Sequence, residues 1–449
     1  MKILVVTNLF PPHHADTDDF RCQNVTEALR ARGHTVRVLT STCGLASEAG
    51  HTARGFSVGA DGDALVQRRL RLNGAYGQPA VSSLSELREL EARNQGVLRE
   101  ALAAYAPELV HVWNLTGLSK SLMLTLRRAN VPTVFDVAEP WVTEQLRTDT
   151  WLSWWHRERV SLPHRLKRGM MEFLNLRTKW DAETPTFIEP GVRRLPAVFD
   201  HEHDASFKPN AAASFQFRRL YFSSLALKAA TVTAGFRVSH AAVIHPGVDT
   251  KLFHGEVKPA SAAVKKFLIV TRLNPQCGIA TAIDALRLVR AQGVKASLTV
   301  YGRGSSEVLA KLRTRAVQGE VPVDFRSGGL QRELPLIYQS HDALIYPVET
   351  AEAFVGPPLE AMACGLPVIV NQDHGVEDLF TSNESCLTYP SGDSGLLANR
   401  MLELIQTPGL AAQLAEVGQN EVLTRYQFAT AVEHIERYLE DSLAQWQSM

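Results

Sequence analysis

The chain has 449 residues, of which 45% are hydrophobic and 21% are charged, a composition typical of a globular protein with room for two domains. Its 47 Lys and Arg balance its 47 Asp and Glu, which argues against nucleic acid as the main partner, because phosphate backbones recruit clustered excess cations. Five scattered cysteines without a CxxC pair indicate neither a disulfide framework nor a zinc site.

The first residues and the cysteines together predict a cytoplasmic protein. The apolar run Lys2–Thr7 is too short for a signal peptide and is typical of a buried first strand. No apolar run reaches the roughly 18 residues that a membrane span needs. Unpaired cysteines suit a reducing compartment. The glycosylation sequon Asn114–Thr116 is then expected to have no function.

The first part of the chain predicts a parallel α/β domain. A strand over Lys2–Asn8, a helix over residues 20–32 and a strand over Thr35–Thr40 make a βαβ unit. Short buried strands are expected again at Leu109–Trp113 and Thr133–Val137. This alternation predicts a parallel sheet covered by helices.

Residues 141–215 interrupt the alternation and are interpreted as an insertion. One interpretation is an acceptor lid, a partner surface or a membrane-surface patch, since aromatic and basic side chains suit an anionic interface. The other, which we favour, is a set of helices that pack their aromatic side chains onto the first sheet and turn their arginines outward. The insertion contains Trp141, Trp151, Trp154, Trp155 and Trp180, and the basic residues Arg157, Arg159, Arg165, Lys167, Arg168, Arg177 and Lys179.

A second α/β domain is expected after a linker at residues 246–262. Its predicted strands are Phe267–Thr271, Ser297–Tyr301, Val323–Phe325, Ala343–Tyr346 and Pro367–Asn371, with helices at Ala280–Ala291 and Glu307–Val317 and a last helix at Ala429–Gln447. Two such domains favour a ligand between the carboxyl ends of their sheets.

The strongest motif is Glu352-Ala-Phe-Val-Gly-Pro-Pro-Leu-Glu360, which is followed by Ala-Met-Ala-Cys-Gly-Leu-Pro-Val. It predicts a turn that enters a helix at Pro358, where proline is tolerated. The free amides of such a turn suit an anion, and a carboxylate at each end suits sugar or ribose hydroxyls. An ordinary helix entry with solvated acids is equally compatible with the spacing alone.

This segment resembles the two-glutamate motif of the retaining GT-B glycosyltransferases of family 4. Segments at residues 11–12, 28–36, 246–253, 271–273, 301–304 and 375–377 also resemble that family, so the resemblance spans nearly the whole chain apart from residues 141–215. The motif matches at Phe354, Pro358, Leu359, Glu360, Ala361, Met362, Ala363, Gly365, Pro367 and Val368.

The resemblance implies an α/β protein of the GT-B fold, with two Rossmann-like domains facing an interdomain cleft. Residues 1–250 would form the acceptor-side domain and residues 251–425 the donor domain, and the helix at 426–449 would return to the first domain. The implied reaction moves a sugar from a nucleotide diphosphate sugar to a hydroxyl acceptor with retention at the anomeric carbon. The donor β-phosphate can act as the base, so no protein nucleophile is required.

The resemblance also assigns roles to residues. Glu352 would contact the sugar near its anomeric side, Arg272 would neutralise the departing diphosphate, and Glu360 would hydrogen-bond the ribose. Further donor-binding candidates are Gly302, Arg303, Phe354, Val355, Gly356 and Cys277, and acceptor-side candidates are Asp16, Thr17, Glu139 and Trp141.

No cofactor is expected beyond the nucleotide sugar, which is a co-substrate, and no metal is expected. No DxD-type motif or histidine cluster compels a metal site, and His201-Glu-His-Asp204 is expected to be a solvated loop. The acceptor is a glycan, a lipid-linked glycan or a small molecule, and a protein partner or peripheral attachment to a membrane is compatible with the insertion.

Four positions depart from the family pattern. Cys277 stands where a phosphate-binding lysine is usual, a loss that Arg303 would have to offset, and Asp16-Thr17 replaces a Gly-Gly pair. Val355 replaces a glycine, and Ala138 replaces a histidine. The Cys277 thiol has no base beside it in the sequence and is expected to be structural.

The departures keep a second function open, that of a degenerate GT-B relative which binds a partner without catalysis. A nucleotide-sugar epimerase would need an acid–base pair that the sequence does not locate. A dinucleotide oxidoreductase is disfavoured because Gly302-Arg-Gly304 lacks the third glycine of its fingerprint.

Overall fold

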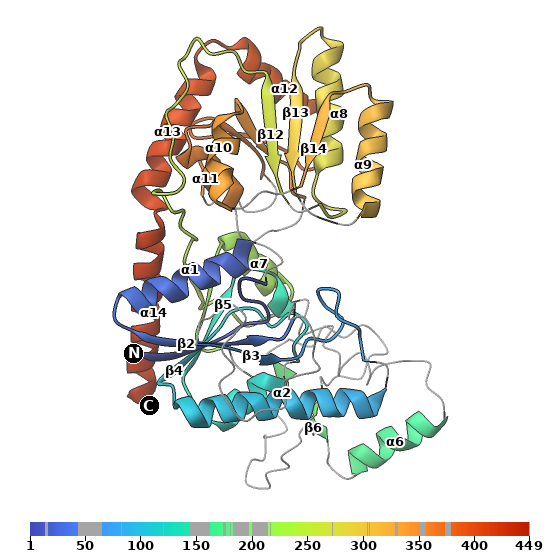
Figure 1. The fold of residues 1–449 in the computed structure, drawn as a ribbon, viewed down its shortest axis with the longest axis vertical. Helices are drawn as coiled ribbons and strands as arrows, with labels where there is room; N and C mark the ends of the chain where they lie inside the picture. The colour runs from blue at the N-terminus through green and yellow to red at the C-terminus, as the bar shows by residue number, and fades with distance from the viewer. Residues whose placement is uncertain are drawn as a thin grey trace. The chain divides into compact units, whose positions relative to one another are not determined.

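A computed structural model shows two α/β units (Figure 1). Unit 1 comprises Met1–Ser223, Lys228–Val243 and Ile435–Met449, and unit 2 comprises Ser224–Leu227 and Ile244–His434. The structure describes residues 1–13, 17–43, 65–81, 83–119, 121–143, 162–173, 177–179, 181–182, 197–199, 214–215, 217–271, 273–302, 304, 306–327, 331–349, 356–372 and 379–448.

Unit 1 is built on a seven-stranded parallel sheet with the order β11-β10-β5-β4-β1-β2-β3. The central strands are buried along nearly their whole length, as expected for a parallel sheet with helices on both faces. The strands are β1 (Lys2–Val6), β2 (Thr35–Ser41), β3 (Val66–Leu70), β4 (Leu109–Val112), β5 (Thr133–Val137), β10 (Leu220–Phe222) and β11 (Ala242–Val243).

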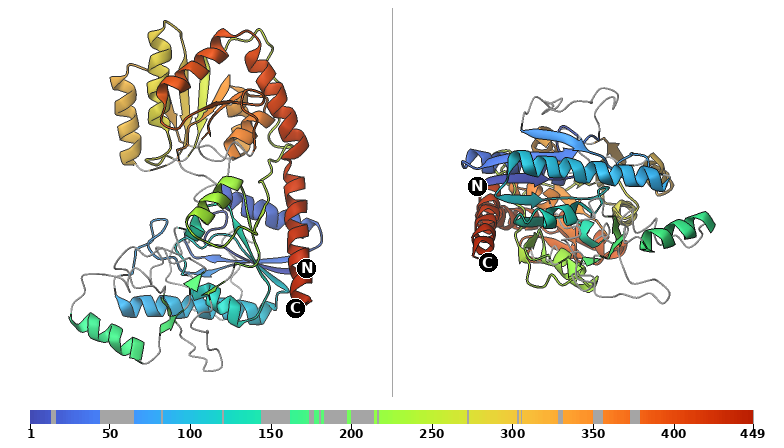
Figure 2. Two further views of the ribbon diagram at one scale, coloured as in Figure 1. Left: turned by 180° about the vertical axis from the view of Figure 1, so that it is seen from behind. Right: turned by 90° about the horizontal axis from the view of Figure 1, so that it is seen from below.

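Helices α1 and α2 lie on opposite faces of this sheet (Figures 1 and 2). Two short two-stranded sheets follow in the insertion, where β6 pairs with β8 and β7 with β9. The helices are α1 (Thr17–Ala31), α2 (Leu84–Tyr105), α3 (Ser121–Arg128), α6 (Leu162–Phe173) and α7 (Leu225–Thr233), and the short strands are β6 (Arg177–Lys179), β7 (Asp181–Ala182), β8 (Ala197–Phe199) and β9 (Ser214–Phe215).

Unit 2 is built on a six-stranded parallel sheet with the order β14-β13-β12-β15-β16-β17. Neighbouring residues of β12 point to opposite faces, so Phe267 and Ile269 enter one hydrophobic core and Leu268 enters the other. The strands are β12 (Lys266–Val270), β13 (Ser297–Tyr301), β14 (Val323–Arg326), β15 (Ala343–Tyr346), β16 (Val368–Asn371) and β17 (Leu387–Tyr389).

The helices of unit 2 follow these strands in the order that a parallel sheet requires. The long helix α14 begins in unit 2, and its residues from Ile435 onward belong to unit 1. None of the described helices is both long and apolar enough to cross a bilayer. The helices are α8 (Ile279–Ala291), α9 (Ser306–Gln318), α10 (Leu334–Gln339), α11 (Gly356–Ala363), α12 (Ser394–Gln406), α13 (Leu410–Arg425) and α14 (Phe428–Gln447).

The predicted fold class is confirmed, and the expected strands are present within a few residues of their predicted bounds. Two details were wrong. The helix after Glu352 begins at Gly356, two residues before the predicted Pro358. Within the insertion, Trp141 is buried as the favoured interpretation expects, whereas Phe173 on α6 is 89% exposed, so that interpretation is wrong for this helix. Trp151, Trp154, Trp155 and Trp180 lie outside the described residues. The acceptor and donor roles of the two domains, with their predicted limits, stay predictions.

Candidate functional site

The candidate donor site of unit 2 lies where the strands of its sheet end. In a parallel sheet the carboxyl ends of all strands share one edge, and the loops after them form the binding edge. Gly302 follows β13 directly, Cys277 lies in the loop between β12 and α8, and Glu360 lies on the helix α11 that follows β15. These three predicted residues therefore belong to segments that follow the carboxyl ends of β12, β13 and β15.

Glycines let the loops of this edge approach one another closely. A Cβ atom on Gly302 would lie 2.1 Å from the carbonyl oxygen of Thr271. Gly278 has a φ of +67°, and a Cβ there would lie 1.8 Å from the carbonyl oxygen of Pro347. Any side chain at position 302 or 278 would overlap these carbonyl oxygens. Glycine is therefore required where the segments after β12, β13 and β15 approach one another.

Glu360 is a buried carboxyl group with a tyrosine partner. Its residue is 7% exposed, and Tyr338 Oη donates a hydrogen bond of 2.7 Å to Glu360 Oε2. Burial raises the pKa of Glu360 to about 7, although the bond from Tyr338 lowers it. Near neutral pH this carboxyl group therefore exists in both protonation states, and its ionised form is an acceptor for ligand hydroxyls.

The partner of Glu360 was not found from the sequence. Tyr338 lies on α10, 22 residues before Glu360, and it is fully buried. Its own pKa is raised well above the usual range by burial and by the neighbouring Glu360. Tyr338 therefore stays protonated and acts only as a hydrogen-bond donor to the carboxylate.

Cys277 is a buried thiol rather than a replacement cation. Burial raises its pKa, although backbone amides at Ile279, Asn274 and Cys277 itself oppose that shift. A protonated thiol is a poor nucleophile and offers no positive charge to a phosphate. This observation agrees with the structural role expected for Cys277.

A second carboxylate at the same edge was also missed. Glu349 follows β15, its Oε1 accepts a 3.0 Å hydrogen bond from Thr281 Oγ1, and its backbone N–H donates to the carbonyl of Gln276 at 3.0 Å. Asn371 Nδ2 donates to the neighbouring carbonyl of Val348 at 2.9 Å. These bonds fix Val348 and Glu349 just after β15. An acidic residue three positions after a buried strand is the signal that could have pointed to Glu349.

The carboxyl edge of the sheet in unit 1 contains an asparagine pair and a glutamate. The backbone N–H of Asn8 donates to the carbonyl of Asn114 at 2.8 Å, and Asn114 Nδ2 donates to Glu139 Oε2 at 2.7 Å. Asn8, Asn114 and Glu139 follow the neighbouring strands β1, β4 and β5. Glu139 is half-buried there, which places this acceptor-side candidate at the edge of the sheet.

Trp141 and Ala138 lie in the core of unit 1. The Trp141 indole is buried, and its Nε1 donates to the carbonyl of Asp136 at 3.3 Å. The structure gives this predicted acceptor-side residue a packing role. Ala138 is also buried, and no described histidine takes its place in the loop after β5.

Beneath this edge lies a buried ion pair that the sequence did not suggest. Arg21 on α1 donates to Asp136 on β5, and its guanidinium lies 4.4 Å from the ring centroid of Trp113. Trp113 Nε1 donates to His111 Nδ1 at 3.3 Å, and the far nitrogen of that ring lies 3.0 Å from Tyr221 Oη. Burial lowers the pKa of His111 to about 3, so the imidazole is neutral.

Several predicted positions lie outside the described residues. They include both predicted catalytic residues and two of the four family departures. Among them are Asp16, Arg272, Arg303, Glu352, Phe354, Val355 and the segment His201–Asp204, together with the side chain of Thr17. The insertion residues Trp151, Trp154, Trp155, Arg157, Arg159 and Trp180 and the segment 375–377 also lie outside them.

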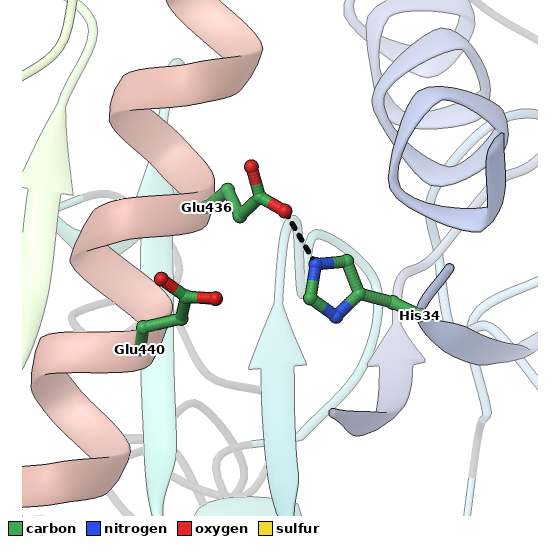
Figure 3. A group of neighbouring side chains, drawn as sticks. All are labelled: His34, Glu436 and Glu440. Atoms are coloured by element: carbon green, nitrogen blue, oxygen red, sulfur yellow. Dashed lines mark hydrogen bonds and ion pairs between the residues drawn. The ribbon is translucent and has the colours of Figure 1, made fainter. Parts of the chain in front are cut away.

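One described group of side chains has the composition of a metal site (Figure 3). His34 Nε2 lies 2.6 Å from Glu436 Oε1, and Glu440 lies one turn further along α14. Arg32 Nε donates to the other oxygen of Glu436 at 2.6 Å. Because both oxygens of Glu436 are occupied, the group serves to tie α14 to the turn before β2.

Two family descriptions match the chain. Residues 256–421 match "Glycosyl transferases group 1", and residues 20–164 match "Glycosyl transferase 4-like domain". The second match ends inside the insertion.

Curated relatives share part of the chain. The amylovoran biosynthesis glycosyltransferase AmsK of Erwinia amylovora is 27% identical over 44% of this chain and 50% of its own length. A GDP-mannose-dependent phosphatidylinositol monomannoside mannosyltransferase of Mycobacterium tuberculosis is 25% identical over 43% of this chain and 54% of its own. The chain spans about half the length of the curated relatives it matches.

Solved structures match the fold over nearly the full chain. Sucrose-phosphate synthase from Thermosynechococcus elongatus aligns with a TM-score of 0.66 and 18% identity over 99% of both chains. HepE of Anabaena, in complex with UDP and glucose, aligns with a TM-score of 0.62 and 18% identity over 98% of this chain and 99% of its own. The fold is therefore GT-B, and the matched families are those of glycosyltransferases. A non-catalytic relative is not favoured by any of these matches.

Proposed function

We propose that this chain, which has the GT-B fold and the matched domains of a glycosyltransferase, moves a sugar from a nucleotide diphosphate sugar to a hydroxyl acceptor with retention of anomeric configuration. The observation that carries the proposal is the buried Glu360 carboxyl group on α11, which accepts a hydrogen bond from Tyr338. Burying a carboxylate costs much free energy, so an amide or an apolar side chain at position 360 would serve a purely structural role at a lower cost. A carboxyl group buried at this position therefore favours a ligand that needs a strong acceptor there.

The donor fits a nucleoside diphosphate hexose. Glu360 would accept hydrogen bonds from the ribose hydroxyls, while Glu352 would contact the sugar and Arg272 the diphosphate. HepE is a structural neighbour in complex with UDP and glucose, and the mannosyltransferase relative is GDP-mannose-dependent. UDP-glucose and GDP-mannose are therefore the first donors to test.

Phosphate binding in this site would depend on Arg272 and on backbone amides. Cys277 supplies no charge, but it lies directly before Gly278, which is the N-cap of α8, and Gly356 begins α11 at the same edge. Free amides at helix N-termini favour phosphate. We also propose that Arg303, Phe354, Val355, Gly302 and Gly356 line the donor, and that Asp16, Thr17 and Glu139 lie on the acceptor side.

Retention would use the leaving diphosphate as the base for the acceptor hydroxyl on the same face of the sugar. A protein nucleophile is then unnecessary, and the raised pKa of Cys277 supports this because it removes one candidate thiolate. The acceptor hydroxyl would belong to a glycan, a lipid-linked glycan or a small molecule.

The test is release of nucleoside diphosphate from UDP-glucose and GDP-mannose, each with a panel of free and lipid-linked glycans. Turnover with one donor, with the anomeric configuration of the product matching the donor by NMR, is the expected result. Glu352→Gln and Glu360→Gln should abolish or strongly reduce turnover. The matched control Glu416→Gln changes an exposed acid on α13 and should leave it unchanged. Inversion at the anomeric carbon would overturn the proposed mechanism.

A further inference from the structure

Helix α6 presents a continuous apolar stripe to solvent. Leu162, Leu166, Met170 and Phe173 are 73%, 69%, 56% and 89% exposed. They follow one another at intervals of four, four and three residues, which places them on one face of a helix. Large apolar side chains are common singly on a protein surface, but four on one helical face mark an interaction site.

Cationic side chains border this stripe on both sides. Arg165 and Lys167 are exposed, and at roughly 100° per residue they lie on opposite flanks of the apolar face. The whole chain has a formal net charge of +0, so any attraction to an anionic surface must come from such a local cluster. The helix therefore combines an apolar face with two cationic borders.

Helix α6 is also expected to be only marginally stable without a partner. It has 12 residues, a length at which an isolated helix is marginal in water. Most helical stability in proteins comes from burial of the apolar face, and the apolar face of α6 is exposed. Figures 1 and 2 show α6 at the periphery of unit 1, apart from its sheet. Burial of the stripe against a partner would supply the missing stabilisation.

We propose that α6 docks unit 1 onto an anionic lipid surface. The stripe of Leu162, Leu166, Met170 and Phe173 enters the boundary between headgroups and acyl chains, and Arg165 and Lys167 contact lipid phosphates at that level. A planar surface suits this design because both cationic borders reach headgroups at once. A protein groove would instead need its own acids on both rims. The inference does not rest on the proposed reaction.

The experiment is co-sedimentation of the full chain with two kinds of vesicle. One kind is phosphatidylcholine alone, and the other is phosphatidylcholine mixed with phosphatidylglycerol. The chain should bind the anionic vesicles more tightly, and binding should weaken as salt is raised, because exposed charges are screened. Each cation near an anionic surface contributes about a fivefold factor, so Arg165→Gln/Lys167→Gln should lower the partition coefficient about 25-fold.

Apolar variants test the other half of the interface. Leu166→Glu/Phe173→Glu should reduce binding to anionic vesicles to background, because charged side chains cannot enter the acyl boundary. The matched control is Val317→Glu on α9, since Val317 is also exposed, at 77%, but lies in unit 2. The control should bind as the wild type does. The changed positions, Leu166, Phe173 and Val317 here and Arg165 and Lys167 above, are all exposed, so these variants should keep the wild-type circular dichroism spectrum and thermal midpoint.

Hydrogen–deuterium exchange identifies the docking element directly. Amides of Leu162–Phe173 should become protected when anionic vesicles are added, while unit 2 should not change. Equal binding to both vesicle types without salt dependence would overturn the proposed role of the cations. Absence of binding to either vesicle, or protection of α6 by self-association alone, would overturn the lipid proposal. Nucleotide binding should be the same in wild type and α6 variants, which keeps failure of this inference distinct from failure of the proposed function.

Discussion

Each unit places a buried carboxyl group close to the carboxyl edge of its sheet, but the two groups have different partners. Asp136 in unit 1 is 1% exposed and forms an ion pair with Arg21. Glu360 in unit 2 is 7% exposed, and its hydrogen-bond partner among the described residues is the neutral hydroxyl of Tyr338. A buried carboxylate loses its hydration, and this loss must be offset by its partners. The positive charge of an arginine offsets it more fully than the neutral hydroxyl of a tyrosine does.

The difference indicates different tasks. Asp136 has its counter-ion within the fold, so it stabilises the packing of α1 against β5 as long as the pair is intact. Glu360 has burial without a counter-ion, and its pKa is raised to about 7. A group held in this way is ready to gain further donors from a ligand, and perturbed pKa values are typical of functional sites.

The largest expected effect comes from breaking the ion pair in unit 1. Arg21→Met leaves the Asp136 carboxylate buried without its counter-ion, which should destabilise unit 1 by about 3–5 kcal/mol. Urea unfolding followed by circular dichroism measures this loss. The double variant Arg21→Met/Asp136→Leu removes both charges and should recover much of it. A double variant no better than the single one would contradict the assigned cause.

The next effect is a pH dependence that belongs to Glu360. Its pKa is raised from 4.5 to about 7 on folding, so between these values the folded state holds a proton that the unfolded state has lost. Its contribution to stability is therefore present at low pH and is lost as pH rises toward 7, by about 3 kcal/mol in total. Glu360→Gln cannot ionise, so it should gain stability relative to wild type as pH rises. Parallel pH profiles of the two proteins would refute this.

A smaller effect is expected from the partner of Glu360. Tyr338→Phe removes the donor to the carboxylate and should cost about 1–3 kcal/mol above neutral pH, and less in acid, where Glu360 is protonated. It should also raise the pKa of Glu360 further, because the Tyr338 bond lowers it. The matched control is Tyr389→Phe, since the buried hydroxyl of Tyr389 has no hydrogen-bond partner among the described residues. If both variants lose the same stability, the Tyr338 bond has no special role.

The sequence predicted the sheets well, because buried parallel strands are short apolar runs between helices and turns. Phe267–Thr271 and Thr133–Val137 are such runs, and both form strands where expected. It also singled out Glu360 as a donor-site candidate, through a motif that resembles a known family, and that role stays a prediction. The difference between Asp136 and Glu360 could not be predicted, since it depends on partners far away in sequence. Arg21 is 115 residues from Asp136, and Tyr338 is brought to Glu360 by a different helix.

The exposure of the apolar face of α6 could not be predicted from the sequence either. The segment Leu162–Phe173 is amphipathic, and such a pattern predicts an apolar face without saying what covers it. Packing onto the first sheet was the favoured interpretation, and the exposed Phe173 shows that it is wrong for this helix.

The most direct test of the central claim is calorimetric titration of UDP, GDP, UDP-glucose and GDP-mannose into the wild type and Glu360→Gln. Ribose hydroxyls donate to the ionised carboxylate, so we expect one nucleotide to bind the wild type more tightly as pH rises through about 7, with release of a proton. Glu360→Gln should bind that nucleotide at least tenfold more weakly and without the pH dependence. Equal affinity of the two proteins for every nucleotide across this pH range would contradict the assignment of Glu360 to the donor site.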